Sequence, residues 1–375
     1  MKIAYVYDNV YPYYIGGLEK RVWEVARRLA QRGHDVHWYA MKYWDGPDVL
    51  EKEGVYLHGV CEPKPLFVHG RRSVEEAIYF ARNVFIPLAR DNYDIIDCQN
   101  FPYFPCFSAK IASLLKKTPL VITWHEVWDT YWYTYLGKKG VFGKAVERIT
   151  ACLTDHNVAV SPKTKNDLQS IGVDKEITVI PNGIDFDSIQ AITPSPEKTD
   201  VIYAGRLIKE KNIDMLIKAI ELVKKELPDV QCTIIGEGPE KEALRTLTLE
   251  LNLERNIRIK DFVTSQDDLF ALMKSARVFV LPSVREGFGI SVLEANACGL
   301  PVVTVEHSQN AAYSLIKNGE NGFIAKLNVE DLTIHICKAL YNTDAKEFTI
   351  ISYSKKYDWN NVISLLERRY HEISN

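Results

Sequence analysis

Residues 278–294 read Val-Phe-Val-Leu-Pro-Ser-Val-Arg-Glu-Gly-Phe-Gly-Ile-Ser-Val-Leu-Glu, which is the clearest strand-to-helix turn in the sequence. It begins with a short apolar run, continues through a loop with two glycines, and ends in an apolar segment of helical period. A buried strand that turns tightly into a helix is the repeating unit of a parallel sheet, whose ligands bind at the carboxyl ends of the strands. Glu286 and Glu294 therefore fall where such a sheet would bind a ligand.

The alternation of short apolar runs and helical segments occurs twice along the chain. The first series predicts strands at residues 3–7, 36–40, 93–98, 120–123 and 157–160, and a helix over 18–32. The second series predicts strands at 201–204, 231–235, 257–259, 278–281 and 301–305, and helices near 212–226, 239–251, 290–298 and 331–341. Residues 192–196, rich in proline, indicate a linker. We therefore expect an α/β protein with two doubly wound, Rossmann-like domains at residues 1–190 and 198–350.

Length and composition exclude some classes of function but do not identify one. A chain of 375 residues has room for two or three domains, and 46% hydrophobic with 25% charged residues is typical of a soluble globular protein. The formal net charge of -3 gives no reason to expect nucleic acid as a partner. The seven cysteines are scattered, which argues against a disulfide framework and a zinc site and favours a reducing compartment.

The N-terminal residues and the hydropathy pattern predict a cytoplasmic protein. Asp8 and Asn9 interrupt the first apolar run too early for a signal peptide, and no segment approaches the ~20 apolar residues of a membrane span.

The glutamates at 286 and 294 suit the recognition of hydroxyl groups. A carboxylate can accept two hydroxyl hydrogen bonds at once, as a sugar or ribose diol requires, while Gly287 and Gly289 let backbone N–H groups approach a ligand closely. The N-terminus of the following helix favours an anion. The alternative interpretation is a purely structural strand-to-helix turn with a glutamate in the first helical turn.

A second candidate lies at residues 205–211, Gly-Arg-Leu-Ile-Lys-Glu-Lys, again between a strand and a helix. Arg206 offers a planar fork of donors and Lys211 a point charge, which together suit a diphosphate. The alternative is a solvated basic loop in which Lys209 and Glu210 are bystanders.

Two features of the first half follow strands in the same way. Gly16-Gly17 precedes the first helix and would let the backbone pass close to a phosphate, although a simple turn explains it equally well. His125, after the strand at 120–123, could orient a substrate hydroxyl or share a proton, although a lone histidine is more often structural. Ser161 before Pro162 is explained as a helix N-cap.

The segment Gly236-Glu237-Gly238-Pro239 fails the dinucleotide-binding test. Position 241 is lysine, so the third glycine of that fingerprint is missing, and we interpret the segment as a tight turn with Pro239 at the first helical position. An NAD-dependent oxidoreductase is therefore disfavoured.

Taken together, these segments resemble the family 4 retaining glycosyltransferases of the GT-B fold over nearly the whole chain. The matching segments are residues 16–19, 179–185, 203–206, 211–212, 235–239, 286–303 and 318–323. The resemblance implies two Rossmann-like domains facing across a cleft. It also implies transfer, with retained configuration, of a hexose-type sugar from a nucleoside-diphosphate sugar to an acceptor hydroxyl, in glycan, glycolipid or cell-surface polysaccharide synthesis. No metal or cofactor is implied, and the acceptor would be a sugar or a lipid-linked sugar.

The resemblance also implies a role for each residue. Arg206 and Lys211 would hold the diphosphate and neutralise the charge that builds on it as the glycosidic bond breaks. Glu294 would accept the ribose hydroxyls and Glu286 the hexose hydroxyls, while His125 would lie near the sugar and the acceptor hydroxyl. The catalytic set is thus His125, Arg206, Lys211 and Glu286, without an assigned nucleophile. The further donor-binding positions are Gly17, Val263, Gly287, Phe288 and Gly289.

Two parts of the chain need separate treatment. Asp261 stands where the family usually has glycine, two residues before Val263, in the loop against the nucleotide base, so UDP, GDP and ADP all stay open. The C-terminal residues 357–375 indicate an amphipathic helix, which the resemblance places on the N-terminal domain.

Aromatic residues crowd residues 124–135, followed by Lys138, Lys139 and Lys144. Aromatic faces stack on sugars and sit at membrane interfaces, and basic residues favour anionic lipid, so this segment is a hypothetical acceptor site and peripheral contact with the inner face of the membrane. Plain packing is the alternative. For the whole chain, the competing functions are a nucleotide-sugar 2-epimerase and a non-catalytic nucleotide-sugar-binding or scaffold protein.

Overall fold

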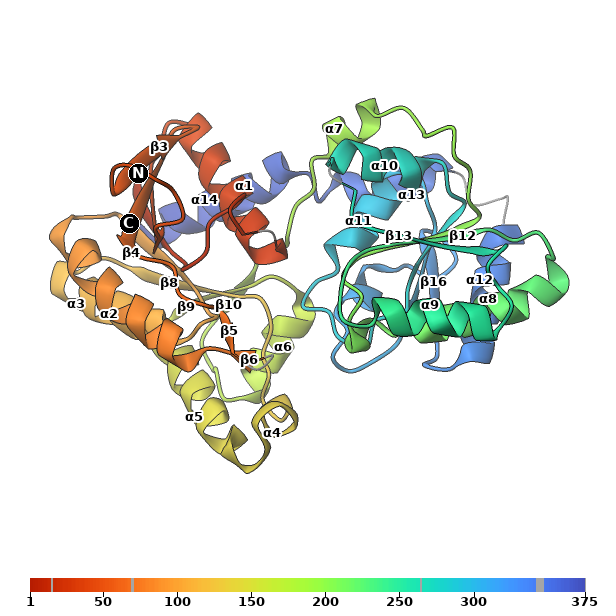
Figure 1. Cartoon of the computed structure of the whole chain (residues 1–375). Helices are drawn as coiled ribbons and strands as arrows, with labels where there is room; N and C mark the ends of the chain where they lie inside the picture. The colour runs from red at the N-terminus through yellow and green to blue at the C-terminus, as the bar shows by residue number, and fades with distance from the viewer. Residues whose placement is uncertain (15, 69–70, 264, 342–346, 375) are drawn as a thin grey trace. The chain divides into compact units, whose positions relative to one another are not determined.

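The structure, a computed structural model, describes residues 1–14, 16–68, 71–263, 265–341 and 347–374. The chain forms two compact units (Figure 1). The first comprises Met1–Asn182 and Trp359–Asn375, and the second comprises Gly183–Asp358. The division falls before residue 190 because α7 (Phe186–Ala191) belongs to the second unit, where the side-chain amide of Gln190 donates to the carbonyl of Ala297 at 2.6 Å.

The first unit is built on an eight-stranded sheet with the order β10-β9-β8-β7-β1-β2-β4-β3. Its strands are β1 (Lys2–Val6), β2 (Asp35–Met41), β3 (Val49–Lys52), β4 (Val55–Cys61), β7 (Ile95–Gln99), β8 (Leu120–Trp124), β9 (His156–Ala159) and β10 (Ile177–Val179). Among these strands only β3 runs antiparallel to its neighbour. A separate hairpin joins β5 (Phe67–Val68) and β6 (Arg71–Arg72).

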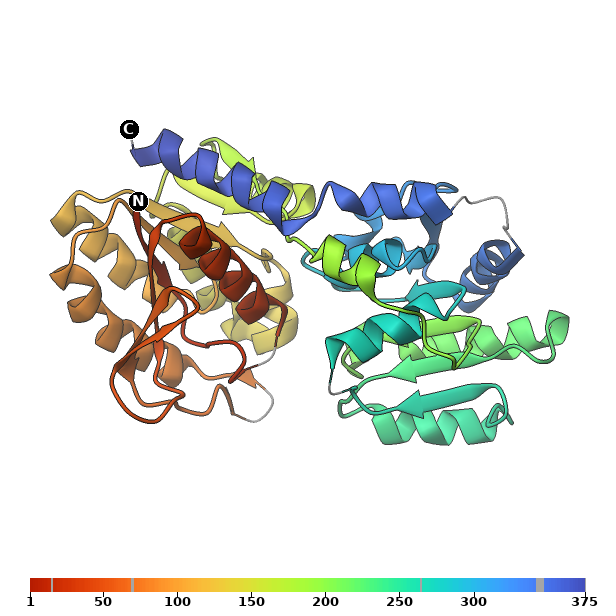
Figure 2. The same ribbon diagram turned by 90° about the horizontal axis from the view of Figure 1, so that it is seen from above.

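Helices cover both faces of this sheet. They are α1 (Gly17–Gln31), α2 (Val74–Arg90), α3 (Phe104–Lys116), α4 (Tyr131–Leu136), α5 (Gly140–Ala151), α6 (Pro162–Ser170) and α14 (Trp359–Ser374), with a 3-10 turn η1 (Gly137–Lys139). α1 and α14 lie side by side on one apolar core (Figure 2), whereas α2 and α3 pack on the core of the opposite face. The terminal helix thus completes a layer that begins at the other end of the chain.

The second unit has a six-stranded sheet of order β13-β12-β11-β14-β15-β16, and every pairing described is parallel. The strands are β11 (Val201–Ala204), β12 (Cys232–Ile235), β13 (Ile257–Lys260), β14 (Val278–Leu281), β15 (Val302–Val305) and β16 (Gly322–Ala325). Besides α7, its helices are α8 (Ile213–Glu226), α9 (Lys241–Glu250), α10 (Gln266–Lys274), α11 (Ile290–Ala297), α12 (Val329–Tyr341) and α13 (Glu347–Lys355), with 3-10 turns η2 (Lys209–Lys211) and η3 (Ala312–Leu315). α8, α9 and α12 cover one face, and α10, α11 and α13 cover the other (Figure 1).

The predicted α/β fold with two Rossmann-like sheets is confirmed, with corrections in detail. Ser161 caps α6 as expected, since its hydroxyl accepts from the backbone N–H of Thr164 at 3.0 Å. Pro239 is not the first residue of α9, which begins at Lys241. The physical reason is the turn before it: a Cβ at Gly236 would lie 1.9 Å from the carbonyl oxygen of Gly205, so residues 236–238 press against the neighbouring loop before the helix starts.

Substituting alanine at Gly289 should destabilise the second unit. Gly289 has φ +98°, and its added Cβ would lie 2.5 Å from that of Ala312, so strain and overpacking add to at least about 2 kcal/mol. Gly319→Ala is the matched control, because Gly319 has φ +83° but an added Cβ meets nothing within 4 Å. Urea unfolding followed by circular dichroism should show a clearly larger loss for Gly289→Ala, and equal losses would contradict the role of the Ala312 contact.

Candidate active site

Two neighbouring strands of the second unit bring an ammonium and a carboxylate together. β11 is followed by the loop that holds Lys211, and β14, which pairs with β11, is followed by the loop that holds Glu286. Lys211 Nζ lies 2.5 Å from Glu286 Oε1, and only 13% and 15% of these side chains are exposed. The parallel sheet therefore assembles a charged pair at its carboxyl edge from residues 75 positions apart.

Backbone hydrogen bonds hold both loops in place. The N–H of Val284 donates to the carbonyl of Glu210 at 2.9 Å, which ties one loop to the other. The N–H of Glu286 donates to Gln309 and its carbonyl accepts from Ala311, at 3.0 and 2.8 Å. The Glu286 carboxylate therefore projects from backbone that is fixed on both sides.

Arg206 lies on the same loop as Lys211 and is exposed. Its backbone carbonyl accepts a hydrogen bond from the Tyr203 hydroxyl at 3.0 Å, which fixes the residue's position. The guanidinium itself makes no hydrogen bond or ion pair with any residue that the structure describes. Its donors are available to an anion at the carboxyl end of β11.

The remaining predicted positions of this unit lie around the start of α11. Gly289 is the N-cap of that helix, and Glu294 is half-buried in the helix itself. Phe288 is buried and packs edge-on against the Tyr357 ring, with centroids 6.1 Å apart. Gly287 lies between Glu286 and this buried ring, so the loop is anchored at its middle.

The loop at residues 261–263 carries a cluster of ion pairs that the sequence did not predict. The Asp261 carboxylate pairs with the Lys241 ammonium, which also lies 2.7 Å from Glu237, and these contacts lower the pKa of Asp261. Val263 is half-buried two residues further on. Lys241, noted above only as the residue that breaks a glycine fingerprint, instead joins the ends of β12 and β13.

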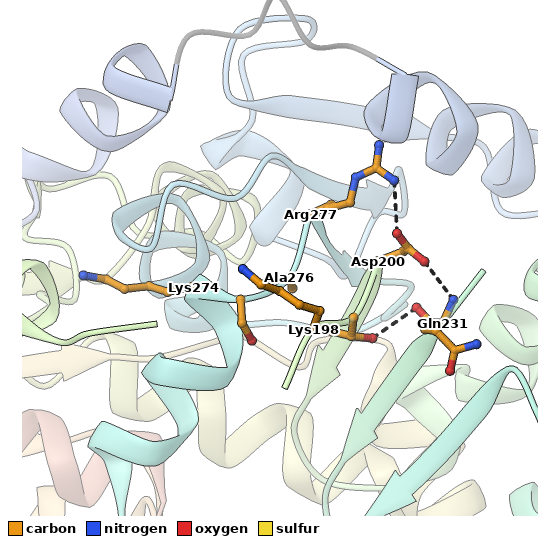
Figure 3. A pocket seen from close by; sticks show the side chains of 8 residues that line it. Lys198, Asp200, Gln231, Lys274, Ala276 and Arg277 are labelled. Atoms are coloured by element: carbon orange, nitrogen blue, oxygen red, sulfur yellow. Dashed lines mark hydrogen bonds and ion pairs between the residues drawn. The ribbon is translucent and has the colours of Figure 1, made fainter. Parts of the chain in front are cut away.

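A hollow of about 350 Å³ lies at the opposite edge of this sheet (Figure 3). Its lining residues precede β11, β12 and β14, so it opens at their amino ends. Arg277 is committed to Asp200 and to the carbonyl of Leu340, and Lys274 donates to the carbonyls of Gln190 and Ile192. Ligands of parallel sheets bind at the carboxyl edge, so we assign no function to this hollow.

In the first unit, His125 directly follows β8 and is half-buried. Its backbone N–H donates to Asn100 Oδ1 at 3.1 Å, and its ring Nε2 lies 2.9 Å from Gln99 Oε1. Burial, together with the positive charge of Arg21, holds the pKa of His125 well below its usual range. The imidazole is therefore neutral at physiological pH. Gly17, also at the carboxyl edge, is the exposed first residue of α1.

Asp97, in the middle of the sheet beside this histidine, is a buried carboxylate that sequence reasoning missed. It accepts from the hydroxyls of Tyr370 at 2.6 Å and Thr123 at 2.9 Å, and from the amide of Gln99 at 2.9 Å. Burial outweighs these donors and raises the pKa of Asp97 to about 6. A carboxylate inside an apolar strand was the available signal.

A second buried group of charges surrounds the end of β1. The Arg72 guanidinium pairs with Asp8 and lies 2.9 Å from Glu76, and both carboxylates are almost fully buried. Burial and the Asp8 charge raise the pKa of Glu76 to about 9. In the sequence, Asp8 is informative only as a residue that argues against a signal peptide. The partners of its side chain lie more than sixty residues away, so no local pattern reveals them.

Most rings of the aromatic segment pack in or against the apolar core of the first unit. Trp124 and Trp132 are buried, and the Trp128 ring packs against Trp132 at a tilt of 42°, with ring centroids 4.6 Å apart. Lys144 is paired with Asp129 at 2.6 Å. The exposed side chains in this region include Tyr133, Lys138, Lys139, Val141, Phe142, Arg148 and Ile149.

Among the described residues, none of the helices has both the length and the hydropathy that crossing a membrane requires.

Comparisons with known proteins give a matching family model for each half of the chain. Residues 15–188 match the family model described as Glycosyltransferase Family 4, and residues 185–357 match the model described as Glycosyl transferases group 1. An uncharacterized glycosyltransferase of Methanocaldococcus jannaschii is 27% identical, with 96% of each chain covered. The GDP-mannose:cellobiosyl-diphosphopolyprenol alpha-mannosyltransferase of Xanthomonas campestris is 24% identical over 99% of this chain and 97% of its own.

A solved structure shows the same fold. Anabaena Alr3699/HepE, crystallised in complex with UDP and glucose, has a TM-score of 0.74 and 21% identity, with 98% of both chains covered. The fold is therefore GT-B, with two Rossmann-like sheets.

The buried Asp97 should make the first unit's stability fall as pH rises from 4 to 6. Its pKa is about 6 in the folded protein and ~3.9 when unfolded, so the folded state binds more protons in this window. Above pH 6 the penalty is constant, at roughly 2–3 kcal/mol. Asp97→Asn should make this slope shallower by the part that Asp97 contributes, while Glu76, whose pKa is also raised, keeps its own part.

All seven tryptophans lie in the first unit, so their fluorescence during urea unfolding measures this effect. Asp187→Asn, at an exposed position of the second unit, is the control. A slope as steep in Asp97→Asn as in the wild type would refute the assignment.

Proposed function

The chain belongs to glycosyltransferase family 4, and from this premise we propose that it transfers a hexose from a nucleoside-diphosphate sugar to an acceptor hydroxyl with retained configuration. The observation that carries the proposal is the Lys211–Glu286 pair at the carboxyl edge of the second sheet, on whose lysine loop the Arg206 guanidinium pairs with no residue that the structure describes. Two cations suit a diphosphate, and a carboxylate suits sugar hydroxyls.

Donor binding would exchange partners within this charged pair. The Glu286 carboxylate neutralises the Lys211 ammonium. A diphosphate carries more negative charge than one carboxylate and would compete for Lys211, aided by Arg206. Glu286 would then be free to accept hydroxyl hydrogen bonds from the hexose. The same ligand that recruits the lysine would thus prepare the carboxylate for the sugar.

The chemistry would depend on stabilising the leaving group. As the glycosidic bond breaks, negative charge builds on the departing diphosphate, and Arg206 and Lys211 would stabilise it without a metal ion. The backbone around Gly287 and Gly289 would approach the donor, and Glu294 would accept the ribose hydroxyls. His125, neutral, would contact a hydroxyl. We assign no nucleophile.

The base and the acceptor are the least constrained parts of the proposal. A UDP complex is known for the Anabaena neighbour, whereas the Xanthomonas relative is named for GDP-mannose, so similarity does not select a base. The latter's name also describes a lipid-linked acceptor. We propose such an acceptor here, in glycan, glycolipid or surface polysaccharide synthesis at the inner face of the membrane.

The exposed apolar surface of α5 supports this placement. Phe142 is 71% exposed, and Val141 and Ile149 are about half exposed. Lys138 and Lys139 precede them on η1. Apolar side chains beside cations favour an anionic lipid surface.

Nucleoside diphosphates should raise the melting temperature of the protein in a panel of UDP, GDP, ADP and their sugar conjugates. At 100 times its Kd a ligand adds ~2.7 kcal/mol of stability. Arg206→Ala and Glu294→Ala should each weaken binding of the active nucleotide by roughly tenfold, because each removes charged hydrogen bonds. Lys209→Ala, an exposed cation on the same loop, is the control and should bind as the wild type does.

If none of these nucleotides shifts the melting temperature, the transferase proposal fails at its first step. Binding without release of nucleotide in the presence of acceptors would favour a non-catalytic role.

Phe142→Glu should reduce co-sedimentation with vesicles that contain anionic lipid, by roughly tenfold at low salt, because it replaces an apolar anchor with a like charge. Phe348→Glu is the matched control, since Phe348 is 81% exposed on the second unit. The membrane proposal is wrong if the wild type does not bind such vesicles or if both variants lose binding equally.

A further inference from the structure

A chain of hydrogen bonds in the first unit links a buried carboxylate to the imidazole of His125. The side-chain amide of Gln99 bridges them: its Nε2 donates to Asp97 Oδ1 at 2.9 Å, and its Oε1 lies 2.9 Å from His125 Nε2. Asp97 and Gln99 are both at least 97% buried. Water therefore does not replace either contact.

The direction of each hydrogen bond in this chain follows from chemistry. An ionised carboxylate can only accept, so the NH2 group of Gln99 must face Asp97. The carbonyl oxygen of the same amide must then face the histidine, and a carbonyl oxygen also only accepts. His125 Nε2 therefore carries the proton that it shares with Gln99. Because a neutral imidazole has one ring proton, Nδ1 must be bare.

We propose that Asp97 and Gln99 are positioning residues that lock His125 as the Nε2-protonated tautomer, so that Nδ1 accepts a hydrogen bond from a substrate hydroxyl. No described residue donates to Nδ1, and the side chain keeps part of its surface exposed. That the hydroxyl belongs to a sugar or acceptor rests on the proposed function, whereas the tautomer itself does not.

The C-terminal helix contributes to this lock. Tyr370 of α14 donates its hydroxyl proton to Asp97 Oδ2 at 2.6 Å and accepts from the Tyr5 hydroxyl at 2.8 Å. Thr123 adds a third donor to the carboxylate, and the fully buried guanidinium of Arg21 stabilises its charge. These donors keep Asp97 an acceptor, which is the condition for the amide of Gln99 to present its oxygen to the ring. The last helix of the chain thus helps to set the tautomer of a histidine that lies one third of the way along the sequence.

The competing arrangement has the amide of Gln99 reversed. Its NH2 group would then donate to a bare Nε2, and its oxygen would face the Asp97 carboxylate, where two acceptors would meet with no proton between them. Only a protonated Asp97 could supply that proton. At pH 8, two units above the pKa of about 6, the carboxylate is ionised and this arrangement is disfavoured.

The test is nitrogen NMR of the nine histidines in the full-length protein at pH 8, with the His125 signal assigned by its loss in His125→Gln. The wild type should show His125 protonated at Nε2 only, with at least roughly tenfold preference over the other tautomer. Gln99→Met removes the acceptor at similar length, and the minor tautomer should rise by roughly tenfold. Gln99→Lys offers only donors and should invert the tautomer.

The control is Thr123→Val, which removes a hydrogen bond to Asp97 but leaves the amide of Gln99 in place; it should keep the wild-type tautomer. A packing role alone would give similar spectra for the threonine and glutamine variants and would overturn the proposal. A wild type protonated at Nδ1 would also overturn it, even if no variant folds. The nucleotide panel on the same wild-type sample separates the tautomer proposal from the proposed function. If His125 is protonated at Nε2 only but no nucleotide binds, the proposed function is wrong and the tautomer proposal still stands.

Discussion

The parallel pairing of strands is the constraint on which the rest of this molecule depends. Strands that all run one way end at one edge, so every loop that follows a strand opens there. In the second unit this places the loops after β11 and β14 beside each other and joins Lys211 to Glu286. In the first unit it places the end of β8, where His125 lies, next to the end of β7, which carries Gln99. Neither pair is close in sequence.

Local patterns were enough to predict the strands that carry these loops. Fully buried parallel strands need continuous apolar runs, and Val278–Leu281 or Val201–Ala204 show them clearly. β3 and β4 were not predicted because the exposed Glu51 and the half-buried Lys52 and His58 interrupt any such run. Candidate donor residues could also be named, since the motifs are contiguous. The sequence could not show which of these side chains meet, because the order of the strands in each sheet decides this.

Buried polar networks were the part that sequence could not supply. In Ile95–Gln99 the aspartate and the glutamine look like interruptions of a strand, and only the fold shows that their partners are Tyr370 from the last helix and a histidine from the next strand. The same holds for Arg72 between Asp8 and Glu76. Burying a charge is costly unless donors surround it, so such groups are specified by the whole tertiary structure rather than by a local pattern.

The candidate site of the second unit presents cations near the surface, whereas that of the first unit holds a half-buried, neutral imidazole. Each arrangement fits the chemistry proposed for it. A diphosphate needs cations that can change partners, and the second unit offers an exposed arginine and a lysine whose only described partner is a carboxylate near the surface. A neutral hydroxyl needs a lone pair at a fixed atom. A protonated imidazole has none to give, so burial that keeps His125 neutral and an amide that occupies its Nε2 proton both serve the same end. Burial and the Gln99 amide therefore act on His125 in the same direction, and both leave Nδ1 with a lone pair for a hydroxyl.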